Sequence, residues 1–245
     1  MKKFVLIGRS LQHSMSPQYF KQKIQSANID ADFQLCDWDS LSKLYSFLSE
    51  NIDIEGFTVT SPYKIAILDY LHEVDNTALQ IGAVNVVKVQ RENGLKLIGF
   101  NTDCIGFEHS LSENIDIQGK NVIILGNGGA AQMAQFVLRP FCEKVDVVSR
   151  KKNKQCILYE ELTSDILLKA DVIVNATPLG MLPNIASCPN IDYSLLTSKH
   201  LLFDMIYNPS KTLFLQKGQF QGAKIVNGWD MFCYQADAAW KIWNN

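Results

Sequence analysis

Short runs of apolar residues recur along the first hundred positions at the spacing expected of buried strands. The expected strands are 4–8, 32–38, 56–60, 83–89 and 95–100, and the expected helices are 16–27, 41–50 and a short one from Pro62. Ser16 followed by Pro17 is a usual helix start. The last two strands are joined through residues 91–94, whose Asn-Gly pair is typical of a hairpin.

Past Asp103 the apolar runs become continuous and alternate with helical segments. The expected strands are 121–126, 144–150, 171–177, 200–206 and 224–227, with a helix at 129–138. The tail is helical in period, with apolar residues at Met231, Phe232, Ala236, Ala239, Trp240 and Trp243. This pattern predicts a parallel sheet covered on both faces. We therefore expect one α/β unit up to about residue 103 and a dinucleotide-binding type of unit after it.

Composition narrows the class of protein further. The 245 residues are 47% hydrophobic and 20% charged with a formal net charge of -2, so no basic surface argues for nucleic acid or an anionic membrane. The six cysteines lack the spacing of a metal site, and free thiols in a reducing cytosol are the simplest interpretation. The apolar run near the N-terminus is too short for a signal peptide. These features predict a soluble cytoplasmic protein without metal.

A glycine-rich segment follows the strand at 121–126 and opens the next helix. Its residues Gly126, Asn127, Gly128, Gly129, Ala130 and Ala131 match the pattern GxGxxA. In such a segment the first glycine permits a tight turn and the second lets the backbone approach a pyrophosphate, which binds at the helix N-terminus. The alternative is a glycine-rich helix cap without a ligand. The motif lies directly between a strand and a helix, and this order favours a dinucleotide site.

The end of the next strand indicates which dinucleotide binds. An NAD site usually has an acidic residue there for the ribose 2′-hydroxyl. Here the strand ends in Ser149, Arg150, Lys151 and Lys152. These cations would attract the 2′-phosphate of NADP, and Arg150 is best suited to bind it with two hydrogen bonds. A solvated basic turn is the alternative; we predict NADP as the cofactor.

Other polar residues are weak signals when each is taken alone. Ser14 and Ser16 could hold a carboxylate, but Ser16 could equally cap its helix. Lys64 could be a solvated turn residue, and Asp103 could cap the helix that begins near Ile105. Asn85 and Gln235 interrupt apolar segments and need partners if they are buried.

The combination of motifs is more specific. In chain order they are HSMSP (13–17), FTVTSPYK (57–64), IGAVNVV (81–87), GFNTDCIGF (99–107), LGNGGAAQ (125–132), NATPLGM (175–181), DMIYNPSKT (204–212) and a tail containing Gly228, Met231 and Gln235. The chain resembles the shikimate dehydrogenase family over essentially its full length. The resemblance implies a substrate-binding catalytic domain at 1–103 and 228–245, a Rossmann-like NADP-binding domain at 104–227, and a C-terminal helix that returns to the first domain.

The resemblance also implies roles for individual residues. Lys64 and Asp103 match the catalytic pair that acts in the reversible NADPH-dependent reduction of 3-dehydroshikimate to shikimate. The implied substrate-binding residues are Ser14, Ser16, Thr60, Asn85, Tyr207 and Gln235. The implied cofactor-binding residues are Gly126, Asn127, Gly128, Gly129, Ala130, Ser149, Arg150, Lys151, Thr177, Met205, Gly228 and Met231. A small-molecule substrate and a monomer or homodimer are expected.

Some positions depart from the usual family pattern. Thr58 stands where the family usually has Asn, Asn127 replaces the usual Ala, and Ser149 replaces Asn in the basic turn. These changes concern affinity and leave Lys64 and Asp103 in place. A dehydrogenase that also accepts quinate remains an alternative, and so does an NADP-binding sensor without activity.

Overall fold

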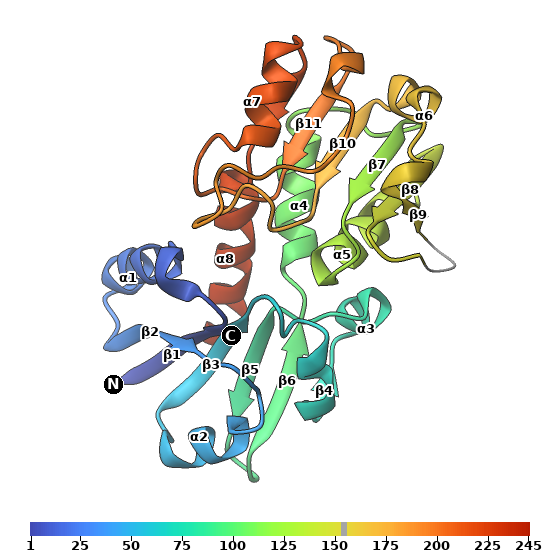
Figure 1. Cartoon of the computed structure of the whole chain (residues 1–245). Coiled ribbons are helices and arrows are strands. Elements are labelled where there is room, and N and C mark those ends of the chain that lie inside the picture. The colour runs from blue at the N-terminus through green and yellow to red at the C-terminus, as the bar shows by residue number, and fades with distance from the viewer. Residues whose placement is uncertain (153–155) are drawn as a thin grey trace. The chain divides into compact units, whose positions relative to one another are not determined.

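The computed structural model describes residues 1–152 and 156–245 of the chain (Figure 1). These residues form two compact units. The first consists of Met1–Thr102 together with Ala236–Asn245, and the second consists of Asp103–Gln235. Each unit is built on its own six-stranded sheet with helices, which confirms the predicted α/β class.

The sheet of the first unit is mixed and has the strand order β2-β1-β3-β5-β6-β4. Its strands are β1 (Lys2–Gly8), β2 (Ala31–Asp37), β3 (Ile54–Val59), β4 (Glu73–Val74), β5 (Val86–Gln90) and β6 (Lys96–Phe100). Its helices are α1 (Ser16–Ala27), α2 (Leu44–Glu50) and α3 (Asn76–Ile81), with 3₁₀ turns η1 (Leu11–His13) and η2 (Ala66–Tyr70). β1 pairs in parallel with β2 and β3, whereas β5 is antiparallel to β3 and β6. The predicted hairpin therefore joins β5 and β6.

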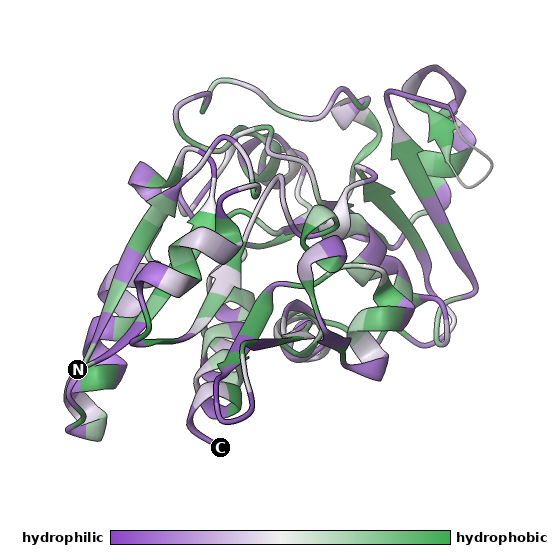
Figure 2. Cartoon of the chain, turned by 90° about the horizontal axis from the view of Figure 1, so that it is seen from below, coloured by the Kyte–Doolittle hydropathy of each residue, from purple (hydrophilic) through white to green (hydrophobic). Residues whose placement is uncertain are grey.

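Both faces of this sheet are covered, which explains the unbroken apolar run in β1. Val5 and Ile7 pack into a core cluster that also contains Leu44 of α2. Phe4 and Leu6 point to the opposite face, into a cluster with Phe20 of α1 and the last turns of the C-terminal helix. Successive residues of a strand point to opposite faces, so a strand buried on both sides must be apolar at every position. Figure 2 shows the hydrophobic colouring that runs along the strands.

The C-terminal helix α8 (Trp229–Asn244) begins in the second unit and ends in the first. The Trp243 ring stacks on Phe4 with 4.7 Å between ring centroids, and its indole nitrogen donates a hydrogen bond of 3.1 Å to the Val87 carbonyl. A Cβ atom on Gly56 would lie 2.4 Å from this indole, so only glycine fits there. The predicted return of the C-terminal helix to the first domain is confirmed.

The sheet of the second unit is entirely parallel, in the order β12-β11-β10-β7-β8-β9. Its strands are β7 (Asn121–Leu125), β8 (Lys144–Ser149), β9 (Ile157–Leu158), β10 (Val172–Asn175), β11 (Leu201–Asp204) and β12 (Lys224–Val226). Its helices are α4 (Asp103–Ser112), α5 (Gly129–Leu138), α6 (Ser164–Lys169) and α7 (Leu213–Phe220), with 3₁₀ turns η3 (Tyr159–Glu161) and η4 (Tyr193–Leu195). The chain leaves β7 toward β8 on one side and later returns to β10 on the other. Ligands of such doubly wound sheets bind beyond the carboxyl ends of the strands at this reversal.

Helices cover both faces of the parallel sheet. On one face, Leu167 of α6 and Phe214 of α7 pack with Ile123, Ile173 and Leu202 of the strands. On the other face, the Phe107 ring of α4 meets the Phe203 ring of β11 edge-on at 5.1 Å. The predicted Rossmann-like arrangement is confirmed, and the polar ends of its strands are left to build a site.

Several predicted bounds differ from the structure. The strands predicted at 171–177 and 200–206 end earlier, at Asn175 and Asp204, because these two side chains bond to the loops that follow them. The helix predicted from Pro62 is a 3₁₀ turn that starts at Ala66. The chain turns before it, since the Tyr63 amide donates to the Thr60 carbonyl at 2.9 Å, and the buried Tyr63 hydroxyl donates to the Trp38 carbonyl at 2.6 Å. The helix that begins at Asp103 starts two residues before the predicted Ile105.

Candidate active site

The glycine-rich segment lies between β7 and α5 and fits a bound pyrophosphate. Gly126 has φ +114°, and a Cβ atom there would lie 2.9 Å from the Ala176 carbonyl oxygen. Gly128 is the N-cap of the ten-residue helix α5, and a Cβ added to it meets no atom within 4 Å. Asn127 and Gly128 are exposed. This open cradle at a helix N-terminus presents backbone N–H groups and a favourable dipole to an anion.

The basic turn follows β8, the neighbour of β7. Arg150 and Lys151 are exposed, and the Ser149 hydroxyl accepts a hydrogen bond of 3.2 Å from the Lys151 amide. Lys152 instead forms an ion pair with Glu161 of η3. Because that carboxylate offsets the charge of Lys152, Arg150 and Lys151 remain the better candidates for a 2′-phosphate.

Three residues expected near the nicotinamide are held together by direct contacts in the second unit. The Thr177 hydroxyl and amide both donate to Asn175 Oδ1, at 2.6 and 3.1 Å. The Met205 amide donates to the Asn175 carbonyl at 3.2 Å. A Cβ atom on Gly228 would lie only 2.3 Å from the Met205 carbonyl oxygen. Thr177, Met205 and Gly228 therefore gather at the carboxyl ends of β10 and β11, and the buried Met231 follows in the first turn of α8.

The two serines of the first unit lie where the loop after β1 enters α1. The Ser16 amide donates to Ser14 Oγ at 3.2 Å, and Ser16 is the first residue of the helix. Met15 is the N-cap and makes no side-chain cap bond, so the capping alternative for Ser16 is wrong. The loop that leads to them is fastened by Asp37, whose carboxylate accepts hydrogen bonds from the amides of Ser10 and Leu11, both at 3.1 Å.

Thr60, Lys64 and Asn85 lie at one end of the first sheet. Thr60 directly follows β3 and its amide donates to the Ile7 carbonyl at 2.9 Å. The Lys64 carbonyl accepts from the Val84 amide at 2.8 Å, next to Asn85. Asn85 is buried, and its side chain both donates to Thr102 Oγ1 at 3.0 Å and accepts from the Thr102 amide at 2.7 Å.

This amide pairing explains why a polar residue interrupts an apolar segment at Asn85. It also fixes the chain at Thr102, the residue that precedes Asp103. Asp103 is buried and opens helix α4. Lys64 and Asp103 belong to different units, and their pairing stays a prediction.

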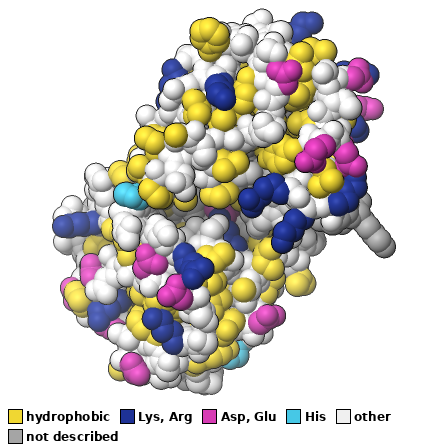
Figure 3. All heavy atoms as spheres, in the orientation of Figure 1, with side chains coloured by type: hydrophobic (Ala, Val, Ile, Leu, Met, Phe, Trp, Pro, Cys, Tyr) yellow, Lys and Arg dark blue, Asp and Glu magenta, His cyan; other side chains and the backbone are white. Residues whose placement is uncertain are grey.

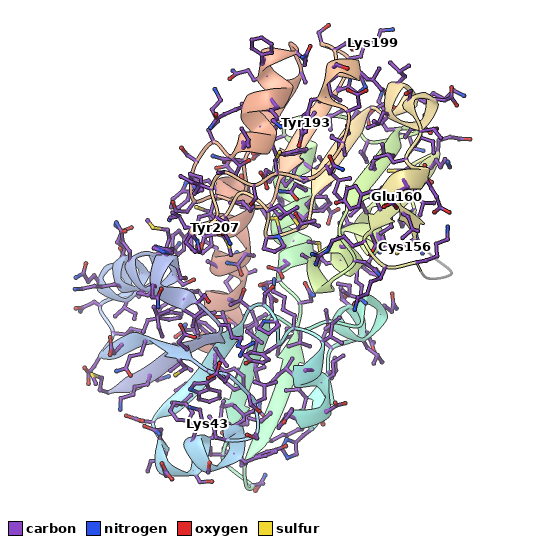
Figure 4. All side chains as sticks on the ribbon, in the orientation of Figure 1. Lys43, Cys156, Glu160, Tyr193, Lys199 and Tyr207 are labelled. Atoms are coloured by element: carbon purple, nitrogen blue, oxygen red, sulfur yellow. The ribbon has the colours of Figure 1, made fainter. Side chains whose placement is uncertain are left out.

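Tyr207 and Gln235 belong to the second unit. Tyr207, labelled in Figure 4, follows β11, and its ring lies 4.7 Å from that of Phe232 and 6.2 Å from that of Trp229. Gln235 Nε2 donates to the Phe232 carbonyl at 3.0 Å. Helix α4 passes close to α8 here, because a Cβ atom on Gly106 would lie 2.3 Å from the Met231 carbonyl oxygen.

Asp204 is a polar residue of this region that the sequence did not single out. It is the last residue of β11 and fully buried, and burial raises its pKa to about 7 although Thr212, Ile206 and Asn175 donate hydrogen bonds to it. A carboxylate that ends an apolar strand was the available signal. Alone it could not identify the three partners.

Other features of the described residues bear on the class of protein. Among them no group of His, Cys, Asp or Glu is arranged to hold a metal ion, and none of their helices is long and apolar enough to cross a membrane. All six cysteines are free thiols. On the face drawn in Figure 3, basic, acidic and apolar side chains are interspersed.

The sequence of this chain is similar to those of shikimate dehydrogenases. The family model of the shikimate dehydrogenase substrate binding domain matches residues 6–87. The NADP(+) shikimate dehydrogenase of Caldicellulosiruptor saccharolyticus is 36% identical over 260 residues, covering 99% of this chain and 92% of that protein.

Solved structures are similar over the same extent. The crystal structure of shikimate dehydrogenase 1 from Peptoclostridium difficile is 38% identical with a TM-score of 0.90, covering 100% of this chain and 92% of that one. The enzyme of Thermus thermophilus, solved with NADP(H) and shikimate, is 28% identical with a TM-score of 0.86, covering 99% of this chain and 93% of that one.

Proposed function

This chain belongs to the shikimate dehydrogenase family, and from that premise we propose that it catalyses the reversible NADPH-dependent reduction of 3-dehydroshikimate to shikimate. The observation that carries the proposal is similarity over essentially the whole chain to a relative named shikimate dehydrogenase (NADP(+)). The activity is that of an oxidoreductase in aromatic amino-acid biosynthesis. We also propose a substrate-binding catalytic domain at 1–103 and 228–245 and an NADP-binding domain at 104–227.

NADP is the cofactor that this proposal requires, and the residues of the second unit suit it. Residues 126–130 would hold the pyrophosphate, because an open helix N-terminus follows the tight turn at Gly126. Ser149, Arg150 and Lys151 would bind the 2′-phosphate. Thr177, Met205, Gly228 and Met231 would line the nicotinamide side. When bound, the cofactor supplies or accepts the hydride.

Lys64 and Asp103 are the proposed proton-handling pair. During reduction, negative charge develops on the carbonyl oxygen of the substrate. The Lys64 ammonium would stabilise this charge and donate the proton, while the Asp103 carboxylate would accept a hydrogen bond from the resulting hydroxyl. Support comes from hydrogen bonds next to each residue: the Lys64 carbonyl accepts from the Val84 amide, and Thr102, which precedes Asp103, is bonded to Asn85.

The remaining polar residues would bind the rest of the ring acid. Ser14 and Ser16 would hold the carboxylate, supported by their position at the start of α1, where N–H groups and the helix dipole favour an anion. Thr60, Asn85, Tyr207 and Gln235 would bind the ring hydroxyls. We also propose that the protein works in the cytoplasm as a monomer or homodimer, without nucleic acid or membrane as a partner; its free thiols suit that compartment.

The test is the rate of reduced-cofactor formation with shikimate or quinate and with NADP+ or NAD+. The proposal predicts turnover of shikimate with NADP+ well above the other combinations. Preference for quinate with NAD+ would contradict both the substrate and the role of the basic turn. NADP+ binding without turnover of either acid would support a sensor instead.

A further inference from the structure

Asp204 connects three separate segments of the second unit. Its Oδ1 atom accepts hydrogen bonds from Asn175 Nδ2 and from the Ile206 amide, both at 3.0 Å. Its Oδ2 atom accepts from the hydroxyl of Thr212, the N-cap of α7. The donors thus come from the end of β10, from the loop after β11 and from the start of α7. Asp204 itself is fully buried.

A buried carboxylate lowers the stability of the fold unless its charge is compensated. Transfer of the charge out of water is unfavourable, and the three hydrogen bonds to Asp204 do not bring its pKa back to the usual value. In its ionised form, however, the carboxylate only accepts hydrogen bonds, so all three donors must point at it. This property fixes directions that an apolar residue would leave free.

The direction of the Asn175 side chain is the first consequence. Because Nδ2 is bound to Asp204, and also to the Leu179 carbonyl at 3.3 Å, Oδ1 must face the Thr177 amide and hydroxyl. The Thr177 hydroxyl in turn accepts from the Leu179 amide at 3.2 Å. The turn that carries Thr177 is thereby held in one conformation.

The second consequence concerns the conformation of the loop after β11. The Ile206 amide donates to the Asp204 carboxylate, so the chain forms a tight turn after Asp204. Met205 and Tyr207 flank Ile206 in this turn. The Ile206 carbonyl then accepts from the Gly228 amide at 3.1 Å. Asp204 is therefore connected to Thr177, Met205, Tyr207 and Gly228. Thr177 is bonded to its partner Asn175, and Met205 is next to Asp204 in the chain. Tyr207 follows its partner Ile206, and Gly228 is bonded to Ile206.

We propose that Asp204 is a positioning residue for hydride transfer: its carboxylate sets the nicotinamide-side residues Thr177, Met205 and Gly228, and Tyr207, in their working arrangement without touching either ligand. The inference rests on the function proposed above. It assigns Asp204 a role that differs from the role of the pyrophosphate cradle, which lies at β7 and α5 and makes none of these bonds.

The test compares Asp204→Ala, Asp204→Asn and Thr212→Val with the control Asp171→Asn. Asp171 also accepts a backbone hydrogen bond, from Asn121 at 2.8 Å, but it precedes β10 at the opposite end of the sheet. For each variant we would measure the turnover of shikimate and the NADP+ affinity by titration calorimetry. We would also measure the amide hydrogen exchange of residues 176–180 and 205–208 in the absence of ligand. Thr212→Val removes one donor to Asp204, together with the cap bond that the Thr212 hydroxyl accepts from the Leu215 amide, and serves if Asp204→Ala does not fold.

We expect kcat to fall about 10- to 100-fold in Asp204→Ala, as for other displacements of groups that position reactants. NADP+ affinity should change little, and exchange should accelerate in both segments. Thr212→Val should show the same pattern more weakly, Asp204→Asn should recover much of the loss, and Asp171→Asn should leave kcat unchanged.

Folded variants with normal kcat and unchanged exchange would overturn the proposal, as would an equal loss in Asp171→Asn. If the wild-type protein turns over no shikimate, the proposed function fails. The exchange measurement then still decides whether Asp204 orders the two segments.

Discussion

Replacing Asp204 by asparagine should remove a loss of stability that the wild-type protein suffers as the pH rises. Burial raises the pKa of Asp204 to about 7, whereas an aspartate in an unfolded chain titrates near 3.9. Between about pH 4 and pH 7 the unfolded chain has lost a proton that the folded chain retains. The free energy of unfolding therefore falls as the pH rises through this window, by about 1.4 kcal/mol per pH unit at most.

The magnitude follows from the two pKa values. At about pH 5 Asp204 is protonated in the folded protein, and most of the stability that its raised pKa contributes is present. At about pH 8 Asp204 is ionised, and almost none of this contribution is left. The wild-type protein should lose about 2 to 3 kcal/mol of unfolding free energy from this group between these two pH values. An asparagine at the same position does not titrate, so the variant should lack this contribution.

Urea unfolding of both proteins, followed by circular dichroism at several pH values, measures the effect. Every other titrating group is common to both chains and cancels in the difference. The unfolding free energy of Asp204→Asn minus that of the wild type should rise by about 2 to 3 kcal/mol from pH 5 to pH 8. A difference that stays constant, or one that falls, would refute the reasoning.

Three further expectations concern binding and packing. Combining Ser14→Ala with Ser16→Ala should raise the KM for shikimate with little change in kcat, because the carboxylate is remote from the reacting carbon; an unchanged KM would exclude the assignment. Arg150→Ala should weaken NADP+ binding by about 10- to 150-fold, the loss of one or more charged hydrogen bonds, and barely affect NAD+; Lys152→Ala, whose ion pair is with Glu161, should do less. Gly106→Ala should destabilise the second unit by about 1 to 3 kcal/mol, because its Cβ atom would lie 2.3 Å from the Met231 carbonyl oxygen, and a normal melting temperature would contradict this.

Much of the fold could be predicted because local patterns decide it. The helix at 129–138 was predicted with its observed bounds, since the glycines before it and the apolar residues within it leave little choice. Strands buried on both faces, such as β1 and β7, were visible as continuous apolar runs. The two-residue strands β4 and β9 were not predicted, because two residues carry no periodicity.

The strand ends were less predictable because long-range bonds set them. Asn175 and Asp204 lie 29 residues apart in sequence, yet their side-chain bond ends both strands earlier than the apolar pattern suggests. The pairing of Lys152 with Glu161 is a similar case, nine residues apart. The sequence offered three cations after β8, with Arg150 as the best suited, and only the fold shows that Lys152 has an acidic partner.

The candidate site was predicted chiefly from the order of motifs. The residues taken one by one gave weak signals, and the bonds of Asn85 to Thr102 or of Thr177 to Asn175 required the structure. Asp204 lies within the motif DMIYNPSKT, but its side-chain partners Asn175 and Thr212 are visible only in the fold.

The most direct test of the account is the turnover of shikimate by NADP+ in the wild-type protein and in Lys64→Ala, with NADP+ binding measured in parallel. We predict an active wild type, a loss of about 10²- to 10⁴-fold in kcat for Lys64→Ala, the usual contribution of acid–base catalysis, and equal NADP+ affinity in both. A Lys64→Ala protein with normal kcat and a raised KM alone would contradict the catalytic role of Lys64, and an inactive wild type that binds NADP+ would contradict the proposed function.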